Sequence, residues 1–79
     1  MLHSDTDGVL IDVGRKIAGL RKRAHMTHAE FAKRLGVRNE VVIKIEKGQY
    51  NMRLGTLMEI ARIFGRRLSI RFVKRKEGV

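Results

Sequence analysis

Residues 27–48 of this chain contain two short helix patterns joined by a tight turn, and few arrangements of two helices fit so short a connection. Thr27 and Glu30 form a Thr-x-x-Glu capping box, which predicts that a helix begins there. Gly36 adopts the left-handed conformation easily and is expected to end that helix in a turn. A second helix follows and ends at Gly48. The two together have the layout of a helix-turn-helix.

Apolar residues recur at helical spacing in both helices and predict the faces that pack into a core. Phe31, Ala32 and Leu35 form this stripe in the first helix, and Val42 and Ile45 form it in the second. The polar residues of the second helix are then expected to face outward. They are Arg38, Asn39, Glu40, Lys44 and Lys47.

Similar patterns on both sides predict two more helices. One is expected upstream, with Asp12 as its cap and a length of about three turns. The other is expected downstream, from about Arg53 to Phe64, and closed by Gly65. The apolar residues that mark these two helices are Val13, Ile17, Leu20 and Ala24, and then Leu57, Ile60, Ala61 and Phe64.

The segment after the last helix alternates with a period of two, which predicts a β-strand. Leu68, Ile70 and Phe72 alternate there with Arg67, Ser69 and Arg71. A lone strand leaves its backbone groups unpaired, so it must pair with residues 8–13 or with its own copy in a second chain. We prefer the second copy, with Leu68, Ile70 and Phe72 as dimerisation residues.

The register of such a pair follows from charge. Antiparallel pairing centred on Ile70 sets Ser69 opposite Arg71 of the other chain. Pairing centred on Ser69 would set Arg67 opposite Arg71, and the two cations would repel. Centring on Ile70 is therefore the expected register.

A chain of 79 residues is expected to form one domain with a marginal core, which a second copy would enlarge. We divide it into a flexible N-terminal segment (1–11), a helix-turn-helix domain (12–65), a dimerisation strand (66–74) and a basic tail (75–79). Cysteine is absent, so no disulfide framework is expected. The sequence has no membrane-length apolar run and no basic leader, and we predict a soluble, cytoplasmic protein without a membrane partner.

The formal net charge is +10, from 18 Lys and Arg against 8 Asp and Glu, and favours a polyanionic partner. Because the charge accompanies a positioned helix pair, we expect double-stranded DNA rather than a membrane surface. One Tyr and three Phe are too few for the aromatic stacking typical of RNA binding.

No enzyme, metal site or cofactor is expected. His3, His25 and His28 lack a carboxylate and a nucleophile at useful spacing. His25 and His28 are three apart, but they straddle the expected helix start and have no third ligand. They are better explained as solvated or phosphate-contacting histidines.

Four segments together resemble the helix-turn-helix domain of phage lambda Cro and repressor, the xenobiotic response element (XRE) family. They are GRKIAGLRKR before the motif, THAEFAKRLGV across its first helix and turn, IEKG at the end of its second helix and TLMEIARIFG after it. The resemblance spans Val13 to Leu68 and implies an all-α, lambda-repressor-like bundle of four to five helices. The short C-terminal β-strand, pairing across a dimer, adds a weaker resemblance to HipB-like antitoxin repressors.

The resemblance also implies roles for single residues. Arg21 and Glu46 occupy the places of a buried ion pair that ties the first helix to the end of the recognition helix. The base-reading positions hold Arg38, Asn39, Glu40, Ile43 and Lys44. The phosphate-contacting positions hold Thr27, His28, Lys47 and again Arg38.

The chemistry of these side chains suits different bases. Asn39 has the donor and acceptor that match adenine, Lys44 donates to guanine, and Glu40 accepts from cytosine N4. Ile43 either touches a thymine methyl group or is an ordinary half-buried side chain. Arg38 stands where the family usually has a capping Ser or Thr, so it either binds phosphate or reads a base.

These observations predict a homodimeric, sequence-specific repressor acting on a palindromic operator. An antitoxin of a type II toxin-antitoxin operon, with a protein toxin as its partner, is a refinement of that prediction. The alternative is a protein-interaction adaptor that keeps the fold without reading DNA, because fold alone does not fix function.

Overall fold

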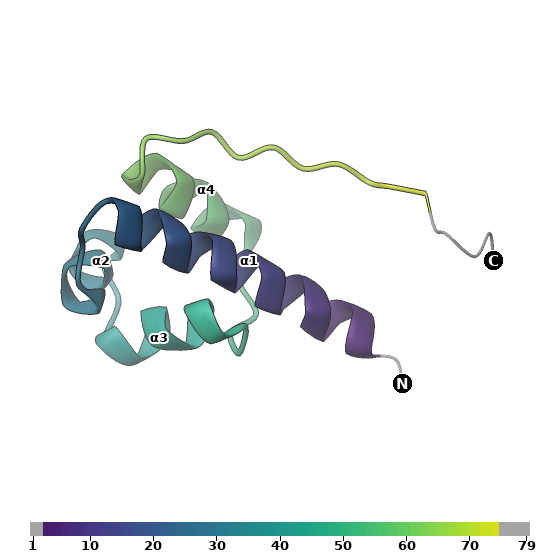
Figure 1. The fold of residues 1–79 in the computed structure, drawn as a ribbon, viewed down its shortest axis with the longest axis horizontal. Helices are drawn as coiled ribbons and strands as arrows, with labels where there is room; N and C mark the ends of the chain where they lie inside the picture. Colours follow the sequence, from purple (N-terminus) through teal and green to yellow (C-terminus); the bar gives the residue numbers. More distant parts are fainter. Residues whose placement is uncertain (1–2, 75–79) are drawn as a thin grey trace.

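Four α-helices follow one another in the computed structural model, which describes residues 3–74 and side chains from Gly8 onward. They are α1 (His3–Arg23), α2 (His28–Leu35), α3 (Asn39–Lys47) and α4 (Leu54–Ile63). The long helix α1 lies between α3 on one side and α4 with the following segment on the other (Figure 1). The predicted all-helical fold is confirmed. No helix within residues 3–74 is long and apolar enough to cross a membrane.

The core lies where α1, α2, α3 and α4 meet. Phe31 and Val42 have no exposed surface, Ile45 is 1% exposed and Ile60 is 2% exposed. The rings of Phe31 and Phe64 pack at 5.2 Å between centroids with a tilt of 54°, a geometry favourable for aromatic pairs. The apolar stripes predicted for the two motif helices thus meet in one cluster.

All four described helices end in the same hydrogen-bond pattern, in which a left-handed residue lets two amides bond back to the last turn. Gly36, Gly48 and Gly65 have φ of 79°, 76° and 67° and serve as this residue after α2, α3 and α4. His25 takes the same place after α1, with φ of 58°. The tight turn predicted at Gly36 is present.

The predicted start of the first helix is wrong. Asp12 lies inside α1 and is exposed, and the helix already begins at His3, within the predicted N-terminal segment 1–11. No Pro interrupts residues 3–23, so nothing in the sequence stops the helix from extending upstream. The backbone of Ile11 also packs against Gly48, which holds this turn of α1 on the bundle.

The predicted β-strand is not seen. Residues 66–74 run as an extended segment without a strand partner in the described part of the chain (Figure 1). Pairing with residues 8–13 is excluded because those residues lie in α1. A strand requires a neighbour for its backbone hydrogen bonds, and one copy of the chain offers none. The predicted basic tail, 75–79, lies outside the described residues.

Candidate nucleic-acid interface

A reciprocal capping box fixes the start of α2. The amide of Thr27 donates to Glu30 Oε1 at 2.8 Å, and the amide of Glu30 donates to Thr27 Oγ1 at 3.1 Å. The capping box predicted from the sequence is therefore present. The Thr27 hydroxyl also donates to Glu30 Oε1 at 3.3 Å, so it both accepts and donates within the cap. A phosphate would therefore meet the free amides of the first turn, or would have to replace Glu30 as the acceptor of this hydroxyl.

One face of α3 points away from the core. Glu40, Ile43, Lys44 and Lys47 follow one another at helical spacing, opposite the buried Val42 and Ile45. The three charged residues are exposed, whereas Ile43 is half-buried. This face therefore offers one acceptor, two cations and one apolar side chain to a ligand.

The N-terminal end of α3 is open. Arg38 is the N-cap residue but its side chain makes no capping hydrogen bond, and Asn39 follows it as the first helical residue. Both side chains are exposed. Amides in the first turn of a helix lack intrahelical partners and carry partial positive charge. This end of α3 is suited to an acceptor-rich or anionic ligand.

The other end of α3 is tied to α1. Arg21 Nε donates to Glu46 Oε2 at 2.6 Å and Arg21 Nη2 donates to Glu46 Oε1 at 3.1 Å, so the ion pair is bidentate. Arg21 Nη1 also donates to the carbonyl oxygen of Met26 at 2.9 Å. Side-chain exposures of 10% and 8% show that the Arg21–Glu46 pair is largely desolvated. Arg21 and Glu46 thus link α1 to the end of α3.

A third side chain joins this pair. His28 Nε2 lies 3.0 Å from Glu46 Oε1, so one carboxylate connects α1, α2 and α3. Burial acts to raise the pKa of Glu46, but the hydrogen bonds from Arg21 and His28 outweigh burial and hold this pKa below its ordinary value of 4.5. No local sequence pattern indicates the contact between His28 and Glu46, because the two residues lie on different helices.

Two glycines let α1 and the end of α3 approach each other closely. A Cβ on Gly14 would lie 2.5 Å from the carbonyl oxygen of Ile45 and 2.6 Å from that of Glu46. A Cβ on Gly48 would lie 2.7 Å from the Cα of Ile11. The contact at Gly14 is not among the sequence-based predictions, although a glycine inside an otherwise regular helix often marks a close approach. Gly14 therefore helps to set the position of α3.

The histidines and acids of the described residues do not gather into a metal site. Among the described residues, no group of three or more His, Cys, Asp or Glu is arranged to hold a metal ion. His25 occupies the left-handed position after α1, whereas His28 contacts Glu46. The local geometry of both residues is accounted for by the fold.

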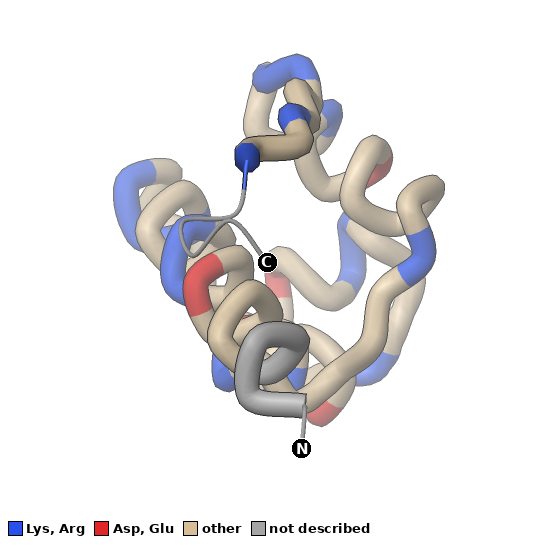
Figure 2. The backbone as a smooth tube through the Cα atoms, turned by 90° about the vertical axis from the view of Figure 1, so that its right-hand side faces the viewer, with Lys and Arg blue, Asp and Glu red and all other residues tan. Residues whose placement is uncertain are grey.

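Lys and Arg residues occur on every helix and along the C-terminal segment (Figure 2). On the motif itself, Lys33 and Arg34 of α2 and Lys44 and Lys47 of α3 are exposed. Both helices of the motif thus carry exposed cations. An open polar face on the second helix of the pair is typical of a helix-turn-helix that binds nucleic acid.

Comparison with known proteins agrees with this class. The family model for the helix-turn-helix of the Cro/C1 (XRE) type matches residues 17–70. The chain belongs to this family of DNA-binding transcription regulators, as the sequence resemblance predicted.

Curated relatives cover most of the chain. Two uncharacterized HTH-type transcriptional regulators of Archaeoglobus fulgidus are each 40% identical over 58 residues, which is 73% of this chain and 82% and 83% of theirs. An uncharacterized HTH-type transcriptional regulator of Methanocaldococcus jannaschii is 34% identical over the same length, covering 73% of this chain and 88% of its own.

Proposed function

We propose that this protein is a transcriptional repressor that binds a palindromic DNA operator as a homodimer and acts in the cytoplasm. The observation that carries the proposal is the outward face of α3, which is exposed at its N-terminal end and anchored to α1 at its other end. A helix held in this way can enter the major groove with its reading side chains already oriented.

In this proposal the side chains that contact the bases are those of Arg38, Asn39, Glu40, Ile43 and Lys44. Asn39 and Lys44 suit adenine and guanine, respectively, because each matches the donors and acceptors on one base edge. Thr27, His28, Lys47 and Arg38 contact phosphates and set the orientation of the domain on the duplex. Repression then follows from occlusion of the promoter.

A homodimer would require an operator with two-fold symmetry. Two copies related by a two-fold axis would place their α3 helices in successive major grooves about 34–36 Å apart. The exposed side chains of Ile70 and Phe72, 57% and 99% accessible in one copy, support an interface at the C-terminal segment. Recognition by two half-sites multiplies the discrimination that one short helix achieves.

The test is selection of bound duplexes from a random pool, read by fluorescence anisotropy at two salt concentrations. The wild type is compared with Asn39→Ala/Lys44→Ala and with Lys16→Ala, a control that removes one cation near the α1–α4 groove, away from α3. Enrichment of a palindrome that is lost only in the double variant is the expected result. Affinity should fall steeply with salt for all three proteins.

The outcome that contradicts the proposal is salt-dependent binding with no enriched sequence and equal affinity in all three proteins. Net charge alone would then explain DNA binding, and the interaction adaptor would replace the repressor.

An antitoxin role is the second candidate. It is favoured by the apolar side chains along the C-terminal segment, a surface that a protein toxin would also use. Its test is purification of the chain from the native host, followed by identification of co-purifying proteins and by a growth assay with each gene expressed alone. A partner that is toxic alone and harmless with this chain is the result expected of an antitoxin.

A further inference from the structure

The segment after α4 exposes apolar side chains and an unpaired backbone together. Leu68, Ile70 and Phe72 are 36%, 57% and 99% exposed, and Val73 is 76% exposed. The last backbone hydrogen bond in this part of the described chain runs from the Arg66 amide to the carbonyl oxygen of Ala61, at 2.7 Å. Beyond Arg66, an extended backbone thus presents its amides and carbonyls to solvent.

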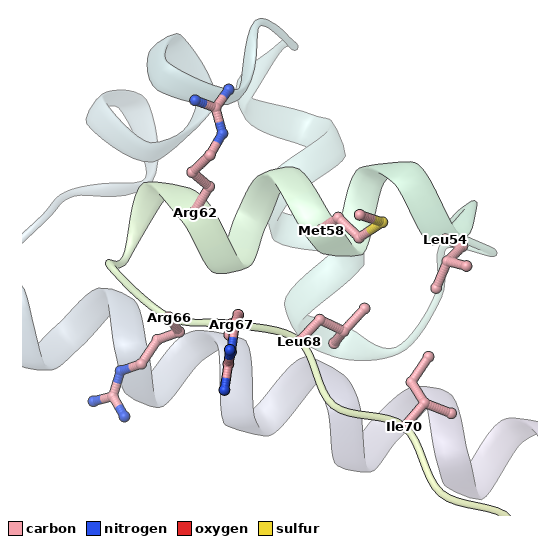
Figure 3. Close-up of a pocket in the computed structure, with 7 residues that line it drawn as sticks. All are labelled: Leu54, Met58, Arg62, Arg66, Arg67, Leu68 and Ile70. Atoms are coloured by element: carbon pink, nitrogen blue, oxygen red, sulfur yellow. The ribbon is translucent and has the colours of Figure 1, made fainter.

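A hollow of about 400 Å³ adjoins this segment on the outer side of α4. Its apolar lining comes from Leu54 and Met58 of α4, which lie one turn apart, and from Leu68 and Ile70 of the segment (Figure 3). Three arginines complete the lining: Arg62, Arg66 and Arg67. Leu54 and Met58 are 55% and 57% exposed, which is unusual for large apolar side chains on a helix that packs into the core with Ile60 and Ala61. One chain therefore carries both a projecting aromatic ring, Phe72, and an apolar hollow.

We infer that this hollow receives Phe72 of a second copy of the chain. Leu54 and Met58 then form, with Leu68 and Ile70, the receptor for the partner ring. This inference rests on the proposed homodimer and adds to it a receptor site on α4.

The geometry of an antiparallel strand pair leads to this contact. Pairing centred on Ile70 sets Phe72 of one copy directly opposite Leu68 of the other, with both side chains on the same face. Because Leu68 lines the hollow, the ring of the partner's Phe72 lies at the edge of the hollow. The two-fold axis makes the contact reciprocal, and each ring enters the hollow of the other copy.

Phe72 is held away from the hollow of its own chain. It lies four residues beyond Leu68 on an extended segment, which spans roughly 3.3 Å per residue. Side chains 68, 70 and 72 share one face of that segment, so the ring projects farther along it instead of folding back. A second copy running in the opposite direction brings its ring to the correct end.

The exposed area agrees with a dimer of ordinary size. The exposed fractions of Leu54, Met58, Leu68, Ile70 and Phe72 together equal about three fully exposed large side chains. At roughly 150 Å² each, these come to about 450 Å² of apolar surface per copy, within the range of the largest single patch on a monomer. A standard interface buries about 800 Å² per partner, and the backbone and arginine stems of the segment supply the remainder.

Because the chain has no cysteine, single-cysteine variants test the register directly. Ile70→Cys should form a disulfide-linked dimer on mild oxidation, because residue 70 faces itself across the axis. Ser69→Cys and Arg71→Cys should each cross-link poorly alone and well when mixed. Arg34→Cys, at an exposed site on α2, measures the background from random collision.

Substitutions that place a charged side chain in the contact test the receptor site. Phe72→Glu and Met58→Glu should each weaken the dimer about thirtyfold or more in sedimentation velocity without DNA, as expected for central interface residues. Val9→Glu, at a 61% exposed site on α1, is the matched control and should leave the dimer unchanged. Retained helical circular dichroism shows that the variants still fold.

Three results would overturn the inference: a wild type that stays monomeric at micromolar concentration, cross-linking by Ser69→Cys alone in place of Ile70→Cys, or a Met58→Glu variant that dimerises as the wild type does. None of these measurements uses DNA, so their results do not depend on the outcome of the operator selection. A monomer that still selects a DNA sequence would remove the dimer and leave specific DNA recognition in place.

Discussion

Replacing Gly14 with Ala tests how closely α1 must approach the recognition helix. The new Cβ would lie 2.5 Å from the carbonyl oxygen of Ile45 and 2.6 Å from that of Glu46. Both neighbours are backbone atoms and cannot rotate away, so α1 and α3 must separate. Added atoms in a packed interior cost about 1–3 kcal/mol, and backbone contacts this short favour the upper end of that range.

Alanine also has a higher helix propensity than glycine, which returns roughly 0.5–1 kcal/mol. Taking about 2–3 kcal/mol as the cost, the expected net result for Gly14→Ala is a loss of about 1–2.5 kcal/mol in the free energy of unfolding. Gly19→Ala is the matched control in the same helix. There the nearest atom is Arg23 Nη2 at 3.3 Å, the end of a flexible side chain, so only the propensity gain of roughly 0.5–1 kcal/mol remains.

The assay is thermal and urea unfolding of both variants at one protein concentration, because association would make the midpoint depend on concentration. A change of 1 kcal/mol shifts Tm by about 4–8 °C in a domain of this size, so the two variants should move in opposite directions. A Gly14→Ala protein as stable as Gly19→Ala would refute the close contact between α1 and the end of α3.

Three further substitutions probe the ends of the helices. Glu46→Gln leaves the buried Arg21 charge uncompensated and should cost roughly 3–5 kcal/mol at neutral pH. The pKa of Glu46 is depressed in the folded state, so its contribution to stability is present above pH 4.5 and is lost as the pH falls through the folded pKa. The free energy of unfolding of the wild type, measured in urea, should therefore decrease below pH 4.5. The variant should lack this pH-dependent decrease. His25→Gly should raise stability by roughly 0.5–1 kcal/mol in thermal unfolding, because glycine adopts the left-handed conformation without strain; an unchanged or lower Tm would contradict this reasoning. Arg38→Ser should supply the missing cap of α3 and add about 1 kcal/mol of stability, while lowering the slope of log affinity against log salt by about one in anisotropy titrations; an unchanged slope would exclude Arg38 as a phosphate contact.

Local patterns predicted most of the bundle. The capping box at Thr27 and the glycines after α2, α3 and α4 are local signals, because each acts within one turn of helix. The buried stripe of Val42 and Ile45 followed from helical spacing alone. These signals also fixed which face of α3 is open, and with it the candidate reading residues.

Contacts between distant elements were not predictable in the same way. The bond from His28 to Glu46 and the approach of Gly14 to Ile45 depend on how three helices cross, which no local pattern encodes. Asp12 was mistaken for a cap because a capping residue and an exposed acid within a helix look alike in one sequence. The C-terminal segment has a strand pattern, but a strand forms only when a partner is present.

The two ends of α3 differ in the contacts that hold them, and this difference bears on the proposed function. At its C-terminal end, Glu46 is bound to Arg21 and His28, and Gly14 and Gly48 allow tight packing against α1. At its N-terminal end no side chain caps the helix, although a Ser or Thr in place of Arg38 would stabilise the fold by about 1 kcal/mol. A DNA phosphate at this end would accept from the free amides and from Arg38, so binding itself would provide the interaction that the free protein lacks. In the proposed complex, a helix that is anchored at its C-terminal end and uncapped at its N-terminal end would keep its side chains oriented and would gain further stabilisation from the bound phosphate.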